Sequence, residues 1–120
     1  MTDISRLTTE IHGRTIKKRR NAAFLMGKSG NLLAIAPLTE ALADPHPGVR
    51  SEIAQALGRL GDSSAVPGLI TALGDSDPYV RVAAISAMGE IRDRDTVDPL
   101  IRCLSDKEVI MRLVDGVVVL

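Results

Sequence analysis

Aromatic side chains are nearly absent from this chain of 120 residues. Phe24 and Tyr79 are its only aromatic residues, and it has no tryptophan. A compact single-core domain of this length usually fills its centre with several aromatic side chains. The hydrophobic share of 45% is nonetheless ordinary for a folded protein. The composition therefore favours a thin, layered fold of alanine, leucine, isoleucine and valine.

Cysteine and histidine are almost as scarce. The single cysteine, Cys103, excludes an internal disulfide framework, so a reducing, cytoplasmic compartment is expected. The two histidines, His12 and His46, fall in different parts of the chain, whereas zinc or iron needs several converging ligands. We therefore expect no metal, no other cofactor and no catalytic residue.

Long apolar runs and net charge are missing too. No apolar run approaches the ~20 residues that span a bilayer. The polar start, residues 1–5, lacks the apolar segment of a secretory signal. Fifteen basic and fifteen acidic side chains cancel. The whole molecule therefore has no field that would select a membrane or nucleic acid.

What the chain does contain is a repeat of 31 residues. Several columns of like residues align at this one constant offset, which leaves little room for coincidence and makes the repeat the first guide to the fold. The aligned columns include Leu7, Leu38, Leu69 and Leu100; Arg19, Arg50, Arg81 and Arg112; Asp44, Asp75 and Asp106; and Gly27, Gly58 and Gly89.

Each repeat has the pattern of two helices. Val66, Leu69 and Leu73 lie at i, i+3 and i+7, which places them on one face of a first helix. A second apolar stripe occupies residues 80–91. Between them, Asp77-Pro78 supplies an N-cap and a proline at the first helical position. The pattern predicts a helical hairpin.

Glycine recurs near the middle of the second helix, at Gly58 and Gly89. Each glycine costs about 1 kcal/mol against alanine in a helix interior. The recurrence therefore predicts a close approach between helices, which compensates for that cost.

A single short hairpin cannot bury its own apolar stripe, whereas stacked neighbours share a continuous core. We predict an all-α fold, an α-solenoid (α-α superhelix) of about four helical hairpins. It forms a single domain, 1–120. The expected repeats are 1–30, 31–61, 62–92 and 93–120, the last of them incomplete.

The stretch 65–89, AVPGLITALGDSDPYVRVAAISAMG, closely resembles the HEAT-like repeats named after phycobilisome lyases. The segments 44–50 and 54–58 are similar to the same motif one repeat earlier, and the resemblance covers residues 34–112. The family includes subunits of enzymes that attach bilin chromophores and many small proteins of unassigned role. Some related solenoids hold a di-iron centre through repeated His-Glu pairs. Here glycine follows His12 and proline follows His46, so the resemblance does not imply that metal chemistry.

In that family an aspartate near the end of the first helix and an arginine early in the second form a ladder along the solenoid. A guanidinium can serve a carboxylate and backbone carbonyls together, so the matching residues are predicted to be structural. Gly13 stands where the first repeat would carry its aspartate. The matching pairs, each six residues apart, are Asp44 with Arg50, Asp75 with Arg81, and Asp106 with Arg112.

Charge is unevenly distributed along the chain. Residues 1–30 carry seven basic and two acidic side chains, and 17–20 form an unbroken basic run. This run fits a solvated helix start, a contact for an acidic protein surface, or a contact for nucleic-acid phosphate. Nucleic acid is the least expected of these, because the rest of the chain is mixed or acidic and stacking aromatics are few.

The inner surface of the solenoid, formed by second-helix residues off the apolar stripe, is the other expected contact surface. Phe24 stands where Gln55 and Ser86 stand in later repeats, so a large ring occupies a polar column. It is either an anchor for a partner or a plug for the end of the core. The expected partner contacts are Lys17, Lys18, Arg20, Asn21, Phe24, Lys28, Gln55, Arg59, Ser86 and Glu90.

The chain ends on the apolar run 117–120, although a terminal repeat should present a polar outer face. A homodimer joined at that end, a partner covering it, or a chain shortened from a longer solenoid explains this, and the homodimer is the most economical. The leading hypothesis for function is a non-catalytic scaffold that binds a protein partner through its inner face or its irregular ends. The alternatives are an accessory subunit of a bilin lyase-like enzyme and nucleic-acid binding through the basic N-terminal segment.

Overall fold

The computed structural model describes residues 4–92, which are helical throughout apart from short turns. Each short helix is followed by a longer one, and each such pair lies inside one predicted repeat. The α-helices are α1 (Ile4–Glu10), α2 (Ile16–Lys28), α3 (Ile35–Ala41), α4 (Pro47–Leu60), α5 (Val66–Ala72) and α6 (Pro78–Arg92). The 3-10 helices η1 (Leu32–Ala34) and η2 (Ser63–Ala65) precede α3 and α5.

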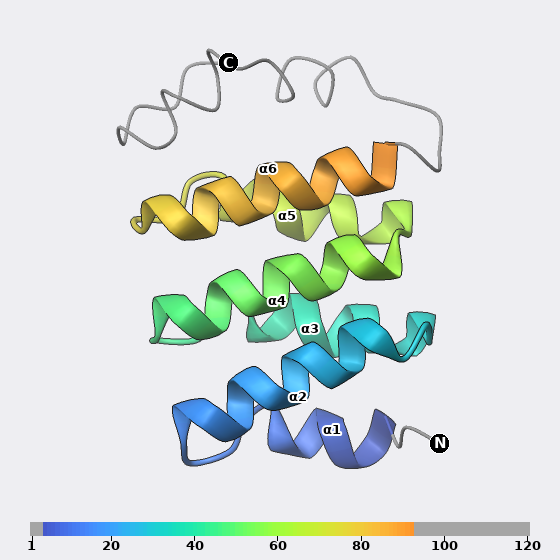
Figure 1. Ribbon diagram of the computed structural model, residues 1–120, viewed down its shortest axis with the longest axis vertical. Helices are drawn as coiled ribbons and strands as arrows, with labels where there is room; N and C mark the ends of the chain where they lie inside the picture. Colours follow the sequence, from blue (N-terminus) through green and yellow to red (C-terminus); the bar gives the residue numbers. More distant parts are fainter. Residues whose placement is uncertain (1–3, 93–120) are drawn as a thin grey trace.

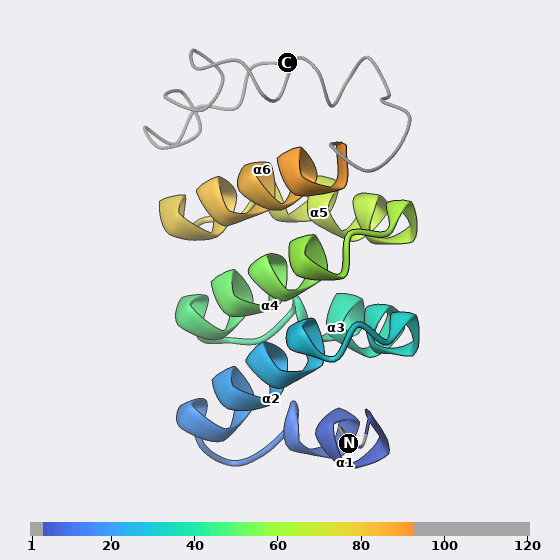
Figure 2. The same cartoon turned by 45° about the vertical axis from the view of Figure 1, so that its right-hand side comes forward.

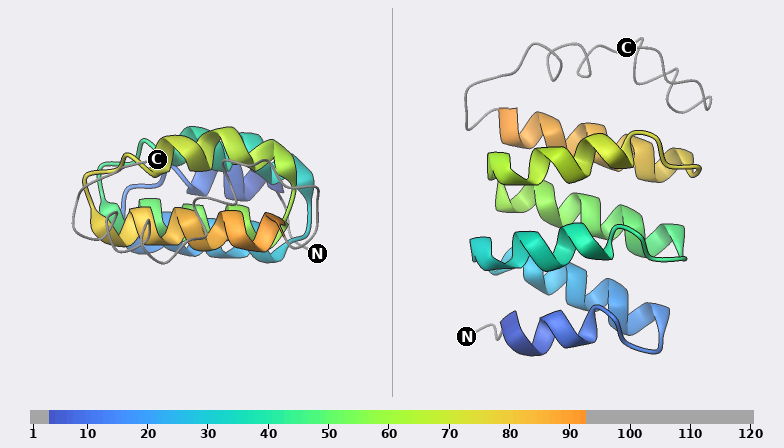
Figure 3. Two further views of the ribbon diagram at one scale, coloured as in Figure 1. Left: turned by 90° about the horizontal axis from the view of Figure 1, so that it is seen from above. Right: turned by 180° about the vertical axis from the view of Figure 1, so that it is seen from behind.

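The helical pairs stack along one axis, from α1 and α2 at one end to α5 and α6 at the other (Figure 1). Seen from above, α1, α3 and α5 form one layer and α2, α4 and α6 form a second (Figure 3). The second helices lie side by side in the turned view as well (Figure 2), and α4 packs chiefly against α2 and α6. The prediction of an all-α solenoid is confirmed. The fourth predicted repeat, with Asp106, Arg112 and the apolar run 117–120, lies outside the described residues.

The core between the two layers is aliphatic. Leu7, Leu38 and Leu69, which form one column of the repeat, are completely buried. Ile53 and Leu57 of α4 are buried with them in the same continuous cluster. Two helical layers this close are filled by leucine, isoleucine, methionine and alanine, which explains why this part of the chain needs so few rings.

Side-chain caps fix where the second helices begin. Each cap accepts a hydrogen bond from a backbone N–H in the first turn, which otherwise has no partner inside the helix. At the far end of α4, Gly61 has a φ of 69° and closes the helix in the left-handed conformation that glycine adopts without strain. The capping atoms are Thr15 Oγ1 at 3.1 Å, His46 Nδ1 at 3.0 Å and Asp77 Oδ1 at 2.9 Å.

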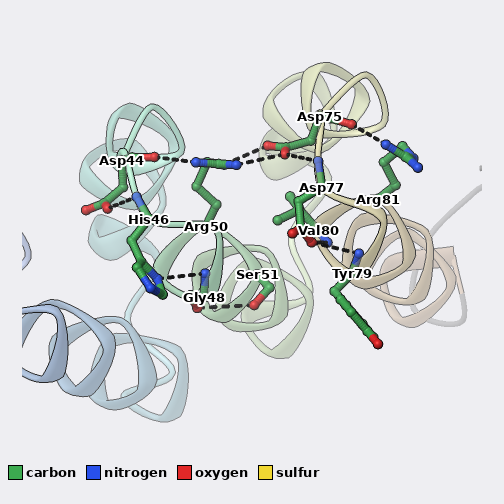
Figure 4. A network of polar contacts seen from close by, with 10 residues as sticks. All are labelled: Asp44, His46, Gly48, Arg50, Ser51, Asp75, Asp77, Tyr79, Val80 and Arg81. Carbon is green, nitrogen blue, oxygen red and sulfur yellow. Dashed lines mark hydrogen bonds and ion pairs between the residues drawn. The ribbon is translucent and has the colours of Figure 1, made fainter. Parts of the chain in front are cut away.

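An arginine at the start of α4 joins two successive repeats (Figure 4). Arg50 donates from Nε and Nη2 to the two carboxylate oxygens of Asp75, at 2.8 and 3.0 Å. Its Nη1 donates to the backbone carbonyl of Asp44 at 2.8 Å. Hydrogen bonding to Asp75 raises the pKa of Arg50 above its ordinary value, against the opposing effect of burial. One planar guanidinium thus holds atoms of two repeats at once.

The same contact recurs one repeat earlier. Arg19 donates from Nε and Nη2 to the carboxylate of Asp44, at 2.7 and 3.4 Å, and from Nη1 to the carbonyl of Gly13 at 3.0 Å. One repeat later, Arg81 donates from Nη1 to the carbonyl of Asp75 at 2.6 Å. These arginine contacts, called the ladder below, run along one edge of the described repeats.

The ladder differs from the pairing expected from the sequence. At the spacing of six residues, Arg50 contacts only the backbone carbonyl of Asp44, and its carboxylate partner lies 25 residues further on in the next repeat. The contact of Arg19 therefore forms although Gly13 has no carboxylate, because Arg19 needs only a backbone carbonyl at that position. The carboxylates of Asp44 and Asp75 each bind an arginine of the repeat before their own.

Neighbouring second helices approach closely at glycine. A Cβ added to Gly58 would lie 2.7 Å from the Cα of Ala87, and one added to Gly27 would lie 2.7 Å from the Cα of Ala56. Both obstacles are backbone atoms, which cannot rotate aside as a side chain does. The recurrent glycine of the second helix is thus a site of helix contact in the first two repeats.

We predict that Gly58→Ala lowers the free energy of unfolding by about 2 kcal/mol, because separating α4 from α6 outweighs the better helix propensity of alanine. Urea unfolding followed by circular dichroism measures the change. Gln55→Ala, on the exposed side of α4, is the matched control and should change stability by no more than about 0.5 kcal/mol. A Gly58→Ala variant more stable than the parent contradicts the close approach.

Candidate functional site

The exposed side of α2, α4 and α6, called the second-helix face below, contains two open grooves. The α2–α4 groove has a volume of about 550 Å³. The basic and polar side chains along it come from α2, and α4 contributes one carboxylate. Its lining residues are Ile16, Lys17, Arg20, Asn21, Phe24 and Glu52.

The α4–α6 groove has a volume of about 600 Å³ and lies between the next two second helices. Four predicted contact residues, Gln55, Arg59, Ser86 and Glu90, line it together. The rest of the lining is Pro47, Gly48, Ser51, Tyr79, Val82 and Ala83. Because α4 lines both grooves, they form one surface across three helices.

Phe24 lies on this face with 37% of its surface exposed. Two cations lie over its ring: Lys28 Nζ at 5.3 Å and Arg59 Cζ at 5.2 Å from the ring centroid. Such contacts hold a ring in place and are worth about 0.5–1 kcal/mol each at exposed sites. Phe24 is not part of the buried core cluster of the described residues. The ring therefore does not plug the core of the described residues, and its contact with a partner stays a prediction.

Arg59 connects the two grooves. Its Nη1 lies 3.7 Å from Glu52 Oε1, and these two residues of α4 line different grooves. The same guanidinium lies over the ring of Phe24 on α2. Carboxylate, guanidinium, ring and ammonium thus form a row that crosses from α4 to α2.

The four residues of the basic run have different surroundings. Lys17 and Arg20 line the α2–α4 groove. Arg19 is part of the ladder. Lys18 lines neither of the two grooves, and an added Cβ on Gly13 would lie 3.5 Å from its Cβ, at the turn before α2. The structure therefore separates Lys18 from the other predicted contact residues.

In the α2–α4 groove, two lining residues, Ile16 and Glu52, were not anticipated from the sequence. Ile16 stands in the column of Pro47 and Pro78, so an apolar side chain replaces a helix-starting proline; that substitution was the available signal. Glu52 and its contact with Arg59 span two turns of one helix. Nothing in the repeat pattern distinguishes Glu52, because its column holds unlike residues in the other repeats.

Between residues 4 and 92, no three His, Cys, Asp or Glu side chains gather where they could hold a metal ion. In the same part of the chain, no helix combines the length and apolar character needed to cross a membrane.

Comparison with known proteins agrees with the geometry. The family model for HEAT repeats matches residues 4–76 and 66–113. A solved structure similar to this chain is that of the complex of CpcE and CpcF of phycocyanin lyase from Nostoc sp. PCC7120. The TM-score is 0.70 at 30% sequence identity, over 77% of this chain and 38% of that chain. No curated protein matches the sequence closely enough to count as a relative.

The chain belongs to the HEAT repeat family. Its repeats are HEAT-like repeats of the phycobilisome lyase type. The chain spans well under half the length of the lyase chain that it resembles, so the likeness establishes the repeat type and the fold.

We predict that Phe24→Gln changes the free energy of unfolding by no more than about 2 kcal/mol, because only the two cation contacts are lost, glutamine occupies this column in the next repeat and the ring lies outside the core. Met26→Gln, two residues along α2 and completely buried, is the contrasting variant. It should cost about 3 kcal/mol or more. Urea unfolding measures both, and equal losses in the two variants would mean that Phe24 belongs to the core.

Proposed function

We propose that this protein is a non-catalytic scaffold that binds another protein on its second-helix face. The observation that carries the proposal is the pair of grooves that share α4. They place basic, acidic, amide and hydroxyl groups beside a partly exposed ring. Interfaces of this kind combine an aromatic or arginine anchor with a polar rim.

The chemistry of the lining supports recognition over catalysis. Neither groove lining includes a histidine or a cysteine, the residues that most often act as general base or thiolate nucleophile. The charged groups are arginine, lysine and glutamate, which form specific contacts with partner side chains. The layer of α1, α3 and α5, called the first-helix layer below, has a smaller groove between α3 and α5, lined mostly by small side chains, among them Ala43, Gly68 and Thr71.

A second candidate is an accessory subunit of a bilin lyase-like enzyme. The likeness to a chain of the CpcE and CpcF complex favours it, because that structure contains two different lyase chains bound to one another. In either case the partner contacts a protein surface of this chain. A homodimer through 117–120 and a cytoplasmic location stay predictions from the sequence.

We predict that a photo-activated cross-linker placed at Gln55 captures a partner protein in extracts of the source cells, whereas one placed at Thr71 does not. Both positions are exposed; Gln55 lies on the second-helix face and Thr71 on the first-helix layer. Mass spectrometry identifies the cross-linked product.

Capture from Thr71 alone, or from neither position, contradicts binding on the second-helix face. A captured protein that carries or attaches a bilin favours the lyase-like candidate over a general scaffold. Unfolding curves of the two labelled proteins should coincide, which verifies that the label has not altered the fold.

A further inference from the structure

We propose that the α2–α4 groove receives an acidic segment of the partner, with a large apolar side chain against Phe24 and Ile16 and carboxylates on the surrounding cations. This inference rests on the proposed function and specifies the chemistry of the partner. It applies to the first of the two grooves.

The α2–α4 groove has an excess of positive charge. Lys17 and Arg20 line it and are exposed, and among residues 4–92 neither forms an ion pair. The one acidic residue in the lining, Glu52, lies 3.7 Å from Arg59 and is therefore already shared with a cation. The ladder arginines differ, because Arg19 and Arg50 have carboxylates from this chain. Lys17 and Arg20 can therefore pair with carboxylates of a binding partner.

An apolar contact lies within the same groove. Ile16 is 41% exposed and Phe24 is 37% exposed, and both line it. In the next two repeats the corresponding columns hold Pro47 and Pro78 for Ile16, and Gln55 and Ser86 for Phe24. Only the first of the described repeats therefore combines two apolar side chains with a basic rim. A groove of about 550 Å³ has room for one large side chain and its neighbours.

The two cations over the ring of Phe24 bring positive charge to the apolar part of the groove. Lys28 Nζ and Arg59 Cζ lie just over 5 Å from the centroid of Phe24. A carboxylate one or two residues from the inserted apolar side chain would reach these cations as well as Arg20. Ion pairs that a bound segment partly covers contribute more than fully exposed ones.

Nucleic acid fits this surface less well. Successive bases would stack on several aromatic rings, and Phe24 is the one aromatic residue in the lining of this groove. The positive surface is also confined to α2 and one residue of α4, while Glu52 and Glu90 line the second-helix face beside it. A segment of protein that carries both charge and an apolar side chain matches both halves of the groove.

A displayed library of random twelve-residue peptides, selected on the full 120-residue chain, tests the inference. The expected result is enrichment of peptides that carry several Asp or Glu residues within a few positions of Leu, Ile, Phe or Met. An enriched peptide, made synthetically with a fluorescent label, then gives dissociation constants by anisotropy. Its affinity should fall as sodium chloride is added, because the charges lie at an open surface.

The variants are chosen for one groove. Lys17→Ala combined with Arg20→Ala should weaken the peptide about tenfold, and Phe24→Gln should do the same, as expected for loss of two ion pairs or of one anchor. The control is Thr9→Glu combined with Thr71→Glu, which changes net charge equally at exposed positions of the first-helix layer. It should leave the dissociation constant within about twofold.

The inference is overturned if the selected peptides lack acidic residues, or if the control weakens binding as much as the groove variants do. It is also overturned if a labelled twelve-nucleotide DNA binds more tightly than any peptide, with the same dependence on Lys17 and Arg20. Failure of the peptide selection while Gln55 still captures a protein would overturn this inference and leave the proposed function standing, because Gln55 lines the other groove.

Discussion

The guanidinium of Arg50, held by a carboxylate of one repeat and a carbonyl of another, is the contact on which the arrangement of the solenoid depends. Apolar burial drives the repeats to stack, but it is non-directional and leaves their register open. A bidentate arginine contact is directional. The aspartates also accept hydrogen bonds from the backbone N–H two residues further on: His46 N donates to Asp44 Oδ1 and Asp77 N donates to Asp75 Oδ1, both at 2.9 Å. The ladder therefore fixes the position of the neighbouring repeat and the conformation of the turn before the second helix.

The second-helix face follows from that register. Successive residues of an α-helix point in directions about 100° apart, so the basic run at the start of α2 is divided among several surroundings. Arg19 is neutralised by Asp44 within the ladder, whereas Lys17 and Arg20 line the groove. Gly27 and Gly58 bring the second helices close together, and this closeness lets Arg59 of α4 lie over Phe24 of α2. A chain without net charge thus presents a locally basic groove.

The periodicity of the sequence was enough to predict the helices, the layered core and the columns of the ladder, because each repeats at one offset. It could not identify the partner of each arginine. Asp44 and Asp75 are both compatible with Arg50 when every repeat carries the same residues, and only the packing of one hairpin on the next decides between them. The contacts of Phe24 could not be predicted from the sequence for the same reason. Lys28 follows it by one helical turn, but Arg59 reaches it from another helix. Glu52 and Ile16 went unnoticed because a groove between α2 and α4 is a property of two helices together.

A double-mutant cycle on Arg50 tests most directly whether the ladder joins successive repeats. Free energies of unfolding are measured for Arg50→Ala, Asp75→Asn and their combination, and then for Asp44→Asn alone and combined with Arg50→Ala. Because Arg50 contacts the carboxylate of Asp75 but only the backbone of Asp44, the first pair should show a coupling energy of about 1–3 kcal/mol. The second pair should be additive to within about 0.5 kcal/mol. Coupling to Asp44 with additivity at Asp75 would contradict a ladder that links each repeat to the next.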